Sequence, residues 1–107
     1  MSVSLKKFTY RNKRILDAAR DKPCQNCAAD DGTIVAAHSN SSKHGKGKGI
    51  KSHDCFVAFL CYRCHSWLDQ GTGKDPSGIW GEKEKPMMFS DAMHKTWLLL
   101  FREGVLR

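Results

Sequence analysis

The strongest constraint on what this chain can fold into is the spacing of its cysteines. Cys24 and Cys27 form one Cys-x-x-Cys pair, and Cys61 and Cys64 form a second. Each pair offers two thiolates from one compact turn, and tetrahedral zinc takes four such ligands at about 2.3 Å. The spacing therefore predicts that the four cysteines hold one structural zinc ion.

Two other interpretations of the cysteines are weaker. Cys55 lies in an apolar run, which predicts a buried thiol, although it could replace one cysteine of a pair. A redox-active Cys-x-x-Cys needs only one pair, in a βαβ context. An odd number of cysteines in a chain without a secretory signal favours metal ligands over a set of disulfides.

Length and charge limit the class of protein. The chain has 107 residues, which predicts one small domain over residues 12–107 after a basic lead-in at residues 1–11. Lys and Arg number 18 against 11 Asp and Glu, so the net charge of +7 favours a polyanionic partner, DNA before an anionic membrane surface. Because no apolar run approaches the roughly 20 residues of a membrane span, and no signal-peptide core follows Met1, we expect a cytoplasmic protein.

The hydrophobic pattern predicts an α+β fold, a small zinc-stabilised core with flanking N- and C-terminal helices. Asn12 could cap a first helix that Pro23 ends, and Ser90 could cap the last helix. The expected packing face of the last helix consists of Met93, Trp97, Leu98, Leu100 and Phe101. The expected order is helix 13–21, strand 33–37 ending on His38, loop 39–53, strand 55–60, a helix from about Cys61 to Gly71, loop 72–86 and helix 91–103.

Three polar side chains are candidates for catalysis. Two of them follow the second cysteine pair, and the third ends a strand. His65 follows Cys64 directly, and Asp69 lies four residues later on the same helical face. If the strands pair and the helix packs across them, His38 faces the same concave side. A histidine that takes a proton from water, beside a divalent cation, suits phosphodiester hydrolysis. Alternatively, His38 caps a strand end, His65 supports the zinc site and Asp69 is a solvated helix residue.

Basic residues flank this group in the sequence. Lysines on a glycine-rich loop suit contacts with phosphates better than contacts with base edges. They predict DNA binding of low sequence specificity. Alternatively, the loop is a solubilising insert, and the basic residues of the first helix form a solvated face. The candidate DNA-binding residues are Lys43, Lys46, Lys48, Lys51 and Arg14.

The order Cys-x-x-Cys, a strand ending in His38, and an apolar strand running into Cys61-x-x-Cys64-His65 resembles the HNH, or ββα-metal, nuclease motif. The similarity is strongest to the small nucleases of lambdoid prophages (the YbcO-like family). It covers nearly the whole chain beyond about residue 12. It includes residues 14–20, the pair Ala37-His38, the lysine-glycine loop, residues 58–65 with Asp69, and residues 97–105.

The resemblance implies roles for the site residues. It makes His38 the general base, His65 a ligand of a catalytic Mg²⁺ or Mn²⁺ ion, and Asp69 a further ligand of that ion, in a prophage protein of the bacterial cytoplasm. Two positions depart from the motif. Ala37 replaces the Asp that often precedes the base, and the middle Asn is absent. Ser52, His53 and Asp54 occupy its neighbourhood, so His53 or Asp54 could supply the missing contact.

Two hypotheses of different class remain open from the sequence, with a weaker third. The first is an endonuclease that uses His38 and His65. The second is a zinc-stabilised DNA-binding module without catalysis. The third is a protein-interaction domain that docks through its apolar C-terminal helix. The sequence determines neither the form of the DNA substrate nor the oligomeric state.

Overall fold

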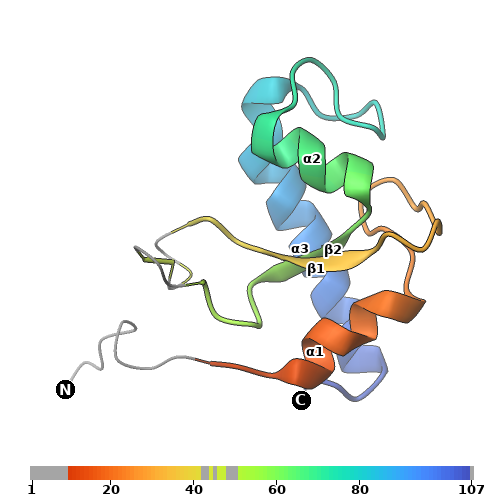
Figure 1. Ribbon diagram of the computed structural model, residues 1–107, viewed down its shortest axis with the longest axis vertical. Helices are drawn as coiled ribbons and strands as arrows, with labels where there is room; N and C mark the ends of the chain where they lie inside the picture. Colours follow the sequence, from red (N-terminus) through yellow and green to blue (C-terminus); the bar gives the residue numbers. More distant parts are fainter. Residues whose placement is uncertain (1–9, 42–43, 45, 48–50, 107) are drawn as a thin grey trace.

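The computed structural model describes residues 10–41, 44, 46–47 and 51–106. A two-stranded antiparallel sheet lies at its centre, formed by β1 (Val35–His38) and β2 (Val57–Leu60), with His38 opposite Val57. Three helices surround the sheet (Figure 1), namely α1 (Lys13–Ala18), α2 (Tyr62–Gln70) and α3 (Lys85–Arg102). Short 3-10 turns follow α1 at Ala19–Asp21 and precede α3 at Glu82–Glu84. The predicted α+β class is confirmed.

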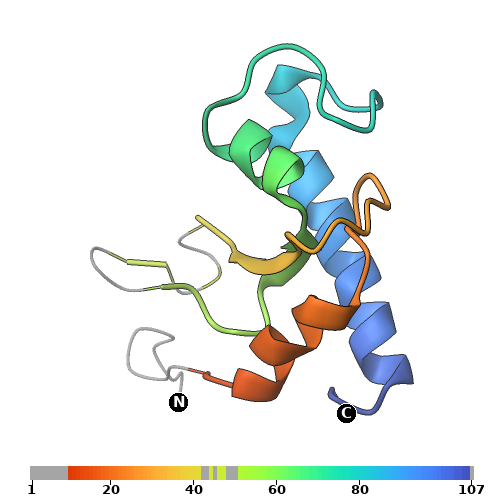
Figure 2. The same ribbon diagram turned by 45° about the vertical axis from the view of Figure 1, so that its right-hand side comes forward.

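The core lies between β2 and α3. All four residues of β2 are buried, because α3 crosses behind the sheet in both views (Figures 1 and 2). The helix contributes a buried stripe with helical spacing, made of Met88, Ala92, Met93, Thr96 and Leu100. This arrangement fixes the strand that leads directly into α2, and therefore the place where α2 begins.

The outer edge of β2 is closed by side-chain and backbone contacts instead of a third strand. The backbone N–H of Phe59 donates to Thr96 Oγ1 at 3.1 Å, and Thr96 Oγ1 donates to the carbonyl of Ala92 at 2.8 Å. The carbonyl of Phe59 accepts from the Gln25 backbone N–H at 2.8 Å. At Phe59 the outer edge of β2 is thus paired with both α3 and the first cysteine turn, which lowers its tendency to pair with another chain.

Replacing Thr96 with valine tests this edge contact. Thr96 is fully buried, so Thr96→Val keeps the shape but leaves the Phe59 N–H without its acceptor. The free energy of unfolding should fall by about 1–3 kcal/mol. Urea unfolding of the metal-loaded protein measures this change. Thr72→Val, the same substitution at an exposed loop position, serves as the control. Equal midpoints for the wild type and Thr96→Val would contradict the assignment.

The last helix begins earlier than the sequence predicted. We expected it to start after Ser90, but α3 starts at Lys85 and Ser90 lies inside it. Pro86 occupies the first turn, where its missing N–H costs nothing, and the Glu84 side chain accepts from the Gly81 N–H at 2.8 Å. The expected packing face was also partly wrong. Leu98 and Phe101 are 71% and 51% exposed, because the buried stripe follows positions 93, 96 and 100.

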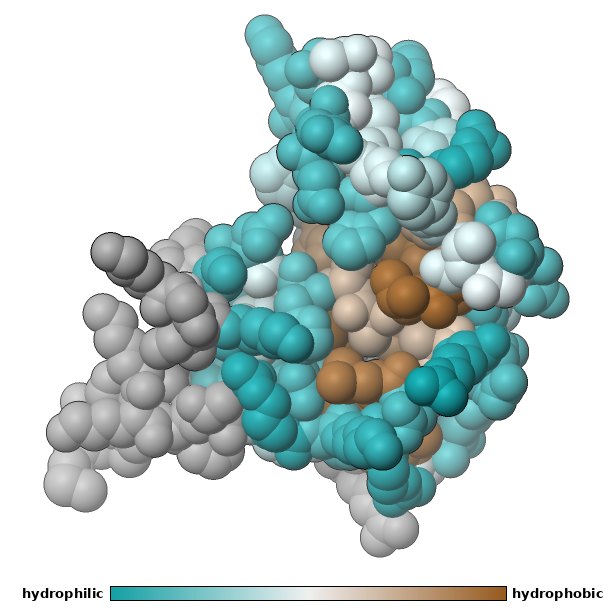
Figure 3. Space-filling view, in the orientation of Figure 1, coloured by the Kyte–Doolittle hydropathy of each residue, from teal (hydrophilic) through white to brown (hydrophobic). Residues whose placement is uncertain are grey.

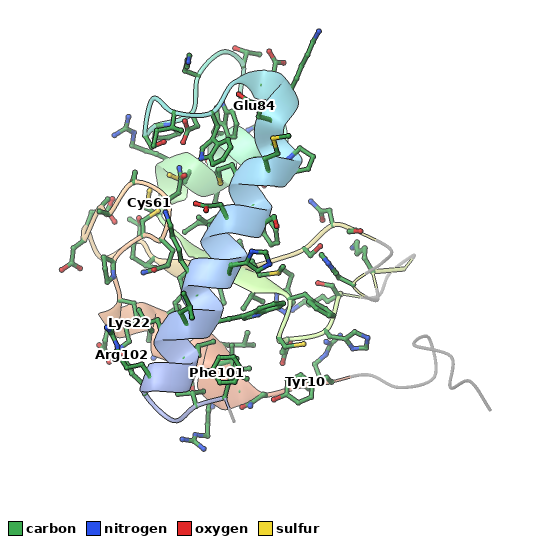
Figure 4. All side chains as sticks on the ribbon, turned by 180° about the vertical axis from the view of Figure 1, so that it is seen from behind. Tyr10, Lys22, Cys61, Glu84, Phe101 and Arg102 are labelled. Atoms are coloured by element: carbon green, nitrogen blue, oxygen red, sulfur yellow. The ribbon has the colours of Figure 1, made fainter. Side chains whose placement is uncertain are left out.

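The segment after α1 lies beside the C-terminal end of α3. Lys22 lies next to the last turn of α3 (Figure 4), and its Nζ pairs with Glu103 Oε1 at 2.8 Å.

Hydrophilic residues cover most of the face in Figure 3, and hydrophobic ones gather in its middle, near β1 and α1. Within the described ranges, no helix combines the length and the apolar character needed to cross a bilayer.

Candidate metal centre and active-site cleft

The two cysteine pairs come together as predicted. The sulfur atoms of Cys24, Cys27, Cys61 and Cys64 all lie within 4.8 Å of one another. A tetrahedral ion with Zn–S bonds of about 2.3 Å separates its sulfurs by about 3.8 Å, and the Cys27 and Cys61 sulfurs are 3.6 Å apart. Four soft thiolates at this spacing suit a structural metal such as zinc. An ion bound by all four would have no open position for a substrate.

Local backbone geometry places the sulfurs of the first pair. The backbone N–H groups of Asn26 and Cys27 point at Cys24 Sγ, at 3.4 and 3.5 Å. The turn closes with Ala28 in the left-handed region (φ 65°), where its N–H donates to the Cys24 carbonyl at 2.9 Å. Hydrogen bonds from the Cys64 thiol and from the backbone hold the pKa of Cys24 well below its usual range, despite burial. The turn is therefore shaped to hold a thiolate.

The second pair stands at the start of α2. Cys61 is the N-cap residue and Cys64 lies in the first helical turn, and both are buried. Because β2 runs directly into α2, the packing of β2 against α3 brings this pair to the first one. The metal centre thus joins two segments that are more than 30 residues apart in the sequence.

A hydrogen-bonded outer layer supports the cysteines. Asn26 Nδ2 donates to Cys64 Sγ at 3.2 Å and to Asp75 Oδ2 at 2.6 Å. Asp75 is 4% exposed and also accepts the backbone N–H groups of Ser77, Ile79 and Trp80. Burial alone would raise the pKa of Asp75, but the hydrogen bonds from Asn26, Ser77 and Trp80 outweigh it and lower this pKa to about 2. Such outer contacts orient metal ligands.

Asp75→Asn should lower the free energy of unfolding at pH 7 by about 2 kcal/mol. The folded pKa near 2 lies below the ordinary value of 3.8, so the ionised carboxylate stabilises the fold above about pH 4. This contribution is lost as the pH falls through the folded pKa. Urea unfolding of the metal-loaded wild type and variant at pH 7 measures the difference. Asp91→Asn, at a solvent-accessible ion pair with Lys95, should change the stability by less than about 1 kcal/mol.

The fifth cysteine stays outside the cluster. Cys55 is half-buried, and its carbonyl accepts from Trp97 Nε1 at 2.6 Å. Burial raises the pKa of the Cys55 thiol. The metal centre is therefore complete without Cys55, and the alternative in which it replaces a paired cysteine is not needed.

A cleft of about 790 Å³ lies between the end of β1, the following loop, α2 and the first half of α3. His38 enters it from β1, and His65 and Asp69 enter it from α2. His38 and His65 therefore line one concave surface. Their catalytic roles stay predictions.

His38 is held by a buried carboxylate. Its Nε2 lies 2.8 Å from Asp54 Oδ1, and the Asp54 side chain is 3% exposed against 18% for His38. Within the described residues, the other ring nitrogen, Nδ1, has no hydrogen-bond partner. His53 has a structural contact instead. Its Nδ1 accepts a hydrogen bond from the Tyr10 backbone N–H at 3.0 Å, and its side chain is buried.

The candidate ligands of the second cation form only a pair. His65 Nε2 and Asp69 Oδ2 lie 3.8 Å apart, with side chains 41% and 56% exposed. Over the described part of the chain, the four cysteines are the only group of three or more His, Cys, Asp or Glu side chains close enough to hold a metal. A cation on His65 and Asp69 would therefore keep most of its coordination for water or a phosphate oxygen, as Mg²⁺ commonly does.

The position before His38 lacks a carboxylate, and the structure does not replace it with a metal ligand. Ala37 is 3% exposed and lines the cleft. Asp54 sits beneath His38, where both of its oxygens accept hydrogen bonds, so it is not directed at the His65–Asp69 pair.

Sequence reasoning missed the wall that α3 adds to the cleft. His94 is exposed and lines the cleft, with its ring centroid 5.3 Å from that of Trp97. No spacing in the sequence relates α3 to His38, because the tertiary packing against β2 brings them together. The cleft residues that the sequence did not indicate include His44, Lys85, Phe89, Ser90, Met93, His94 and Trp97.

The candidate phosphate-binding residues are only partly placed. Lys51 is exposed and lines the cleft, Lys46 is exposed on the same loop, and Arg14 is exposed on α1. Lys43 and Lys48 lie outside the described residues, as does most of the lead-in at residues 1–11. Lys51 is thus the predicted DNA-binding residue that the structure brings to the site.

Comparisons of the chain with protein-family models, with curated proteins and with solved structures give no match. The residues of the cleft and of the metal centre are therefore the features from which a function can be inferred.

Proposed function

We propose that this protein is a metal-dependent endonuclease of the HNH type that hydrolyses phosphodiester bonds in DNA. The observation that carries the proposal is the pairing of His38 with buried Asp54 inside a cleft that also receives His65 and Asp69. The order β1, β2, α2 with the cysteine centre at the start of α2 agrees with the motif that the sequence resembles.

His38 is the general base in this proposal. A base must present an unprotonated nitrogen within hydrogen-bond reach of the attacking water. Nε2 is engaged by Asp54, whereas Nδ1 has no partner among the described residues. Nδ1 is thus the atom that would take the proton from water.

His65 and Asp69 would hold the catalytic Mg²⁺ or Mn²⁺ ion. Imidazole and carboxylate groups both bind such ions, and their donor atoms are 3.8 Å apart here. When bound, the ion supplies stabilisation of the negative charge that develops on the phosphate. The four cysteines serve a separate ion that holds the start of α2.

The substrate class follows from charge. The net charge of +7 attracts a polyanion, and Lys51 stands in the cleft beside the proposed base. Lysine contacts to phosphates carry little sequence information, so we expect low sequence specificity and strong salt dependence. In the same proposal the protein acts in the cytoplasm of a bacterial host, with a phage or prophage origin.

Nicking of a supercoiled plasmid tests the proposal. The wild-type protein, loaded with zinc, should convert supercoiled DNA to the open circular form with Mg²⁺ or Mn²⁺, and a chelator that leaves the cysteine-bound metal in place should stop the reaction. No nicking with either cation, on supercoiled, single-stranded and branched DNA, would overturn it.

The alternative is a zinc-stabilised DNA-binding module without catalysis. The absence of a carboxylate at Ala37 and the two-residue cation site favour this alternative. It predicts retardation of DNA in a gel by the same samples that fail to nick. Nicking that co-purifies with the wild type and disappears with His38→Ala would exclude it.

A further inference from the structure

Asp54 combines deep burial with a direct contact to the proposed base. The residue is 2% exposed and precedes β2, sixteen residues beyond His38. Its Oδ1 lies 2.8 Å from His38 Nε2. A buried charge is costly unless several hydrogen bonds compensate it, so a carboxylate at this place requires an explanation.

The N-terminal segment supplies the compensating contacts. The Asn12 backbone N–H donates to Asp54 Oδ2 at 2.7 Å, and Arg11 Nη1 lies 3.5 Å from Oδ1. The Asp54 backbone N–H donates to the Tyr10 carbonyl at 3.0 Å. The Arg11 guanidinium also donates to the carbonyls of Ser52 at 2.8 Å and of Lys51 at 3.1 Å. Residues 10–12 therefore hold the Asp54 carboxylate and backbone in addition to the contact with His38.

These contacts determine the protonation state of the pair. Burial alone would raise the pKa of Asp54, but hydrogen bonds from His38 and Asn12 and the Arg11 charge keep it below its usual value. An ionised carboxylate can only accept hydrogen bonds, so the proton in the contact belongs to His38 Nε2. In the neutral imidazole the lone pair then stands on Nδ1.

We propose that Asp54 is a positioning residue, which orients the His38 ring and fixes its Nε2–H tautomer so that Nδ1 faces the cleft as the base. Residues 10–12 complete the device by clamping Asp54. This inference rests on the proposed function, since it assigns a role to Asp54 through His38. It does not require Asp54 to contact DNA or the catalytic cation. Carboxylate–imidazole pairs do this in other hydrolases, where the acid holds the base in one tautomer.

Two measurements on Asp54→Asn test the inference. Plasmid nicking should fall at least tenfold, and by no more than the roughly 10²–10⁴-fold that a general base contributes. Nitrogen-15 NMR of the histidine rings should show the Nε2–H tautomer for His38 in the wild type and a mixture with the Nδ1–H tautomer in the variant. The control is Asp91→Asn, which alters the carboxylate of a solvent-accessible ion pair with Lys95 outside the cleft and should leave the nicking rate and the His38 tautomer unchanged.

The outcomes separate this inference from the proposed function. A His38 tautomer that is the same in Asp54→Asn and the wild type overturns the inference, whatever the nicking rate. A wild-type nicking rate in Asp54→Asn overturns it as well. A wild type that shows the expected tautomer but never nicks DNA overturns the proposed function and the catalytic role of Asp54 with it. Metal content and thermal melting of Asp54→Asn are compared with those of the wild type, so that a general loss of fold is recognised.

Discussion

Removal of the cysteine-bound metal is expected to unfold most of this protein. Structural zinc in small domains contributes about 10–16 kcal/mol, which equals or exceeds the 5–15 kcal/mol by which a domain is stable. Among the described residues the sheet has two strands, and a pair of strands is marginal without support. The metal centre links the turn at Cys24 to the start of α2 at Cys61, so its loss releases the packing on both sides of β2.

Circular dichroism and amide NMR dispersion before and after a strong zinc chelator measure this effect. Cys64→Ser should behave like the chelated protein, because it removes a buried ligand. Cys55→Ser is the matched control, since Cys55 is a cysteine outside the cluster, and it should retain both the metal and the fold. A chelated protein with the dispersion and thermal transition of the metal-loaded form would contradict a structural role for the metal.

His38→Ala is expected to abolish detectable plasmid nicking, with a rate loss of about 10²–10⁴-fold. The alanine removes the Nδ1 acceptor and leaves Asp54 without its imidazole partner. Single-turnover nicking with saturating Mg²⁺ or Mn²⁺ measures the loss directly, because it removes product release from the observed rate.

The controls for His38→Ala are made on the same preparation. DNA retardation and zinc content should stay at wild-type levels, since His38 is not among the four cysteine ligands. Equal nicking by the wild type and His38→Ala would show that another group, or a contaminating enzyme, activates the water. Loss of DNA retardation together with nicking would instead assign His38 to substrate binding.

Local signals made much of the fold predictable. Asn12 caps α1 through its side chain, and Pro23 follows the end of the helical segment, as the sequence indicated. β1 and β2 are each two residues shorter at their start than the predicted strands, yet both end where expected, at His38 and Leu60. Both strand ends were predictable because a polar, glycine-rich loop begins at Ser39 and the predicted helix begins at about Cys61.

The start of α3 was not predicted because the local signal, a proline, is compatible with both a loop and the first turn of a helix. Residues 72–86 are rich in glycine, proline and charged residues, which indicates a loop. Proline is equally compatible with the first turn of a helix, and the Glu84–Gly81 hydrogen bond caps the 3-10 turn that leads into α3. Only the burial of Met88 against the core, which is a tertiary contact, distinguishes a helix that starts at Lys85 from a loop.

The sequence by itself determined the metal centre, because two Cys-x-x-Cys turns leave few ways to satisfy four thiols other than one shared ion. It also determined that His65 and Asp69 share a face, since helical spacing places i and i+4 together. The tertiary structure alone decided that Asp54 is the partner of His38 and that α3 closes the cleft. Those contacts join residues from separate elements, and their distances depend on how α3 and residues 10–12 pack against the rest of the chain.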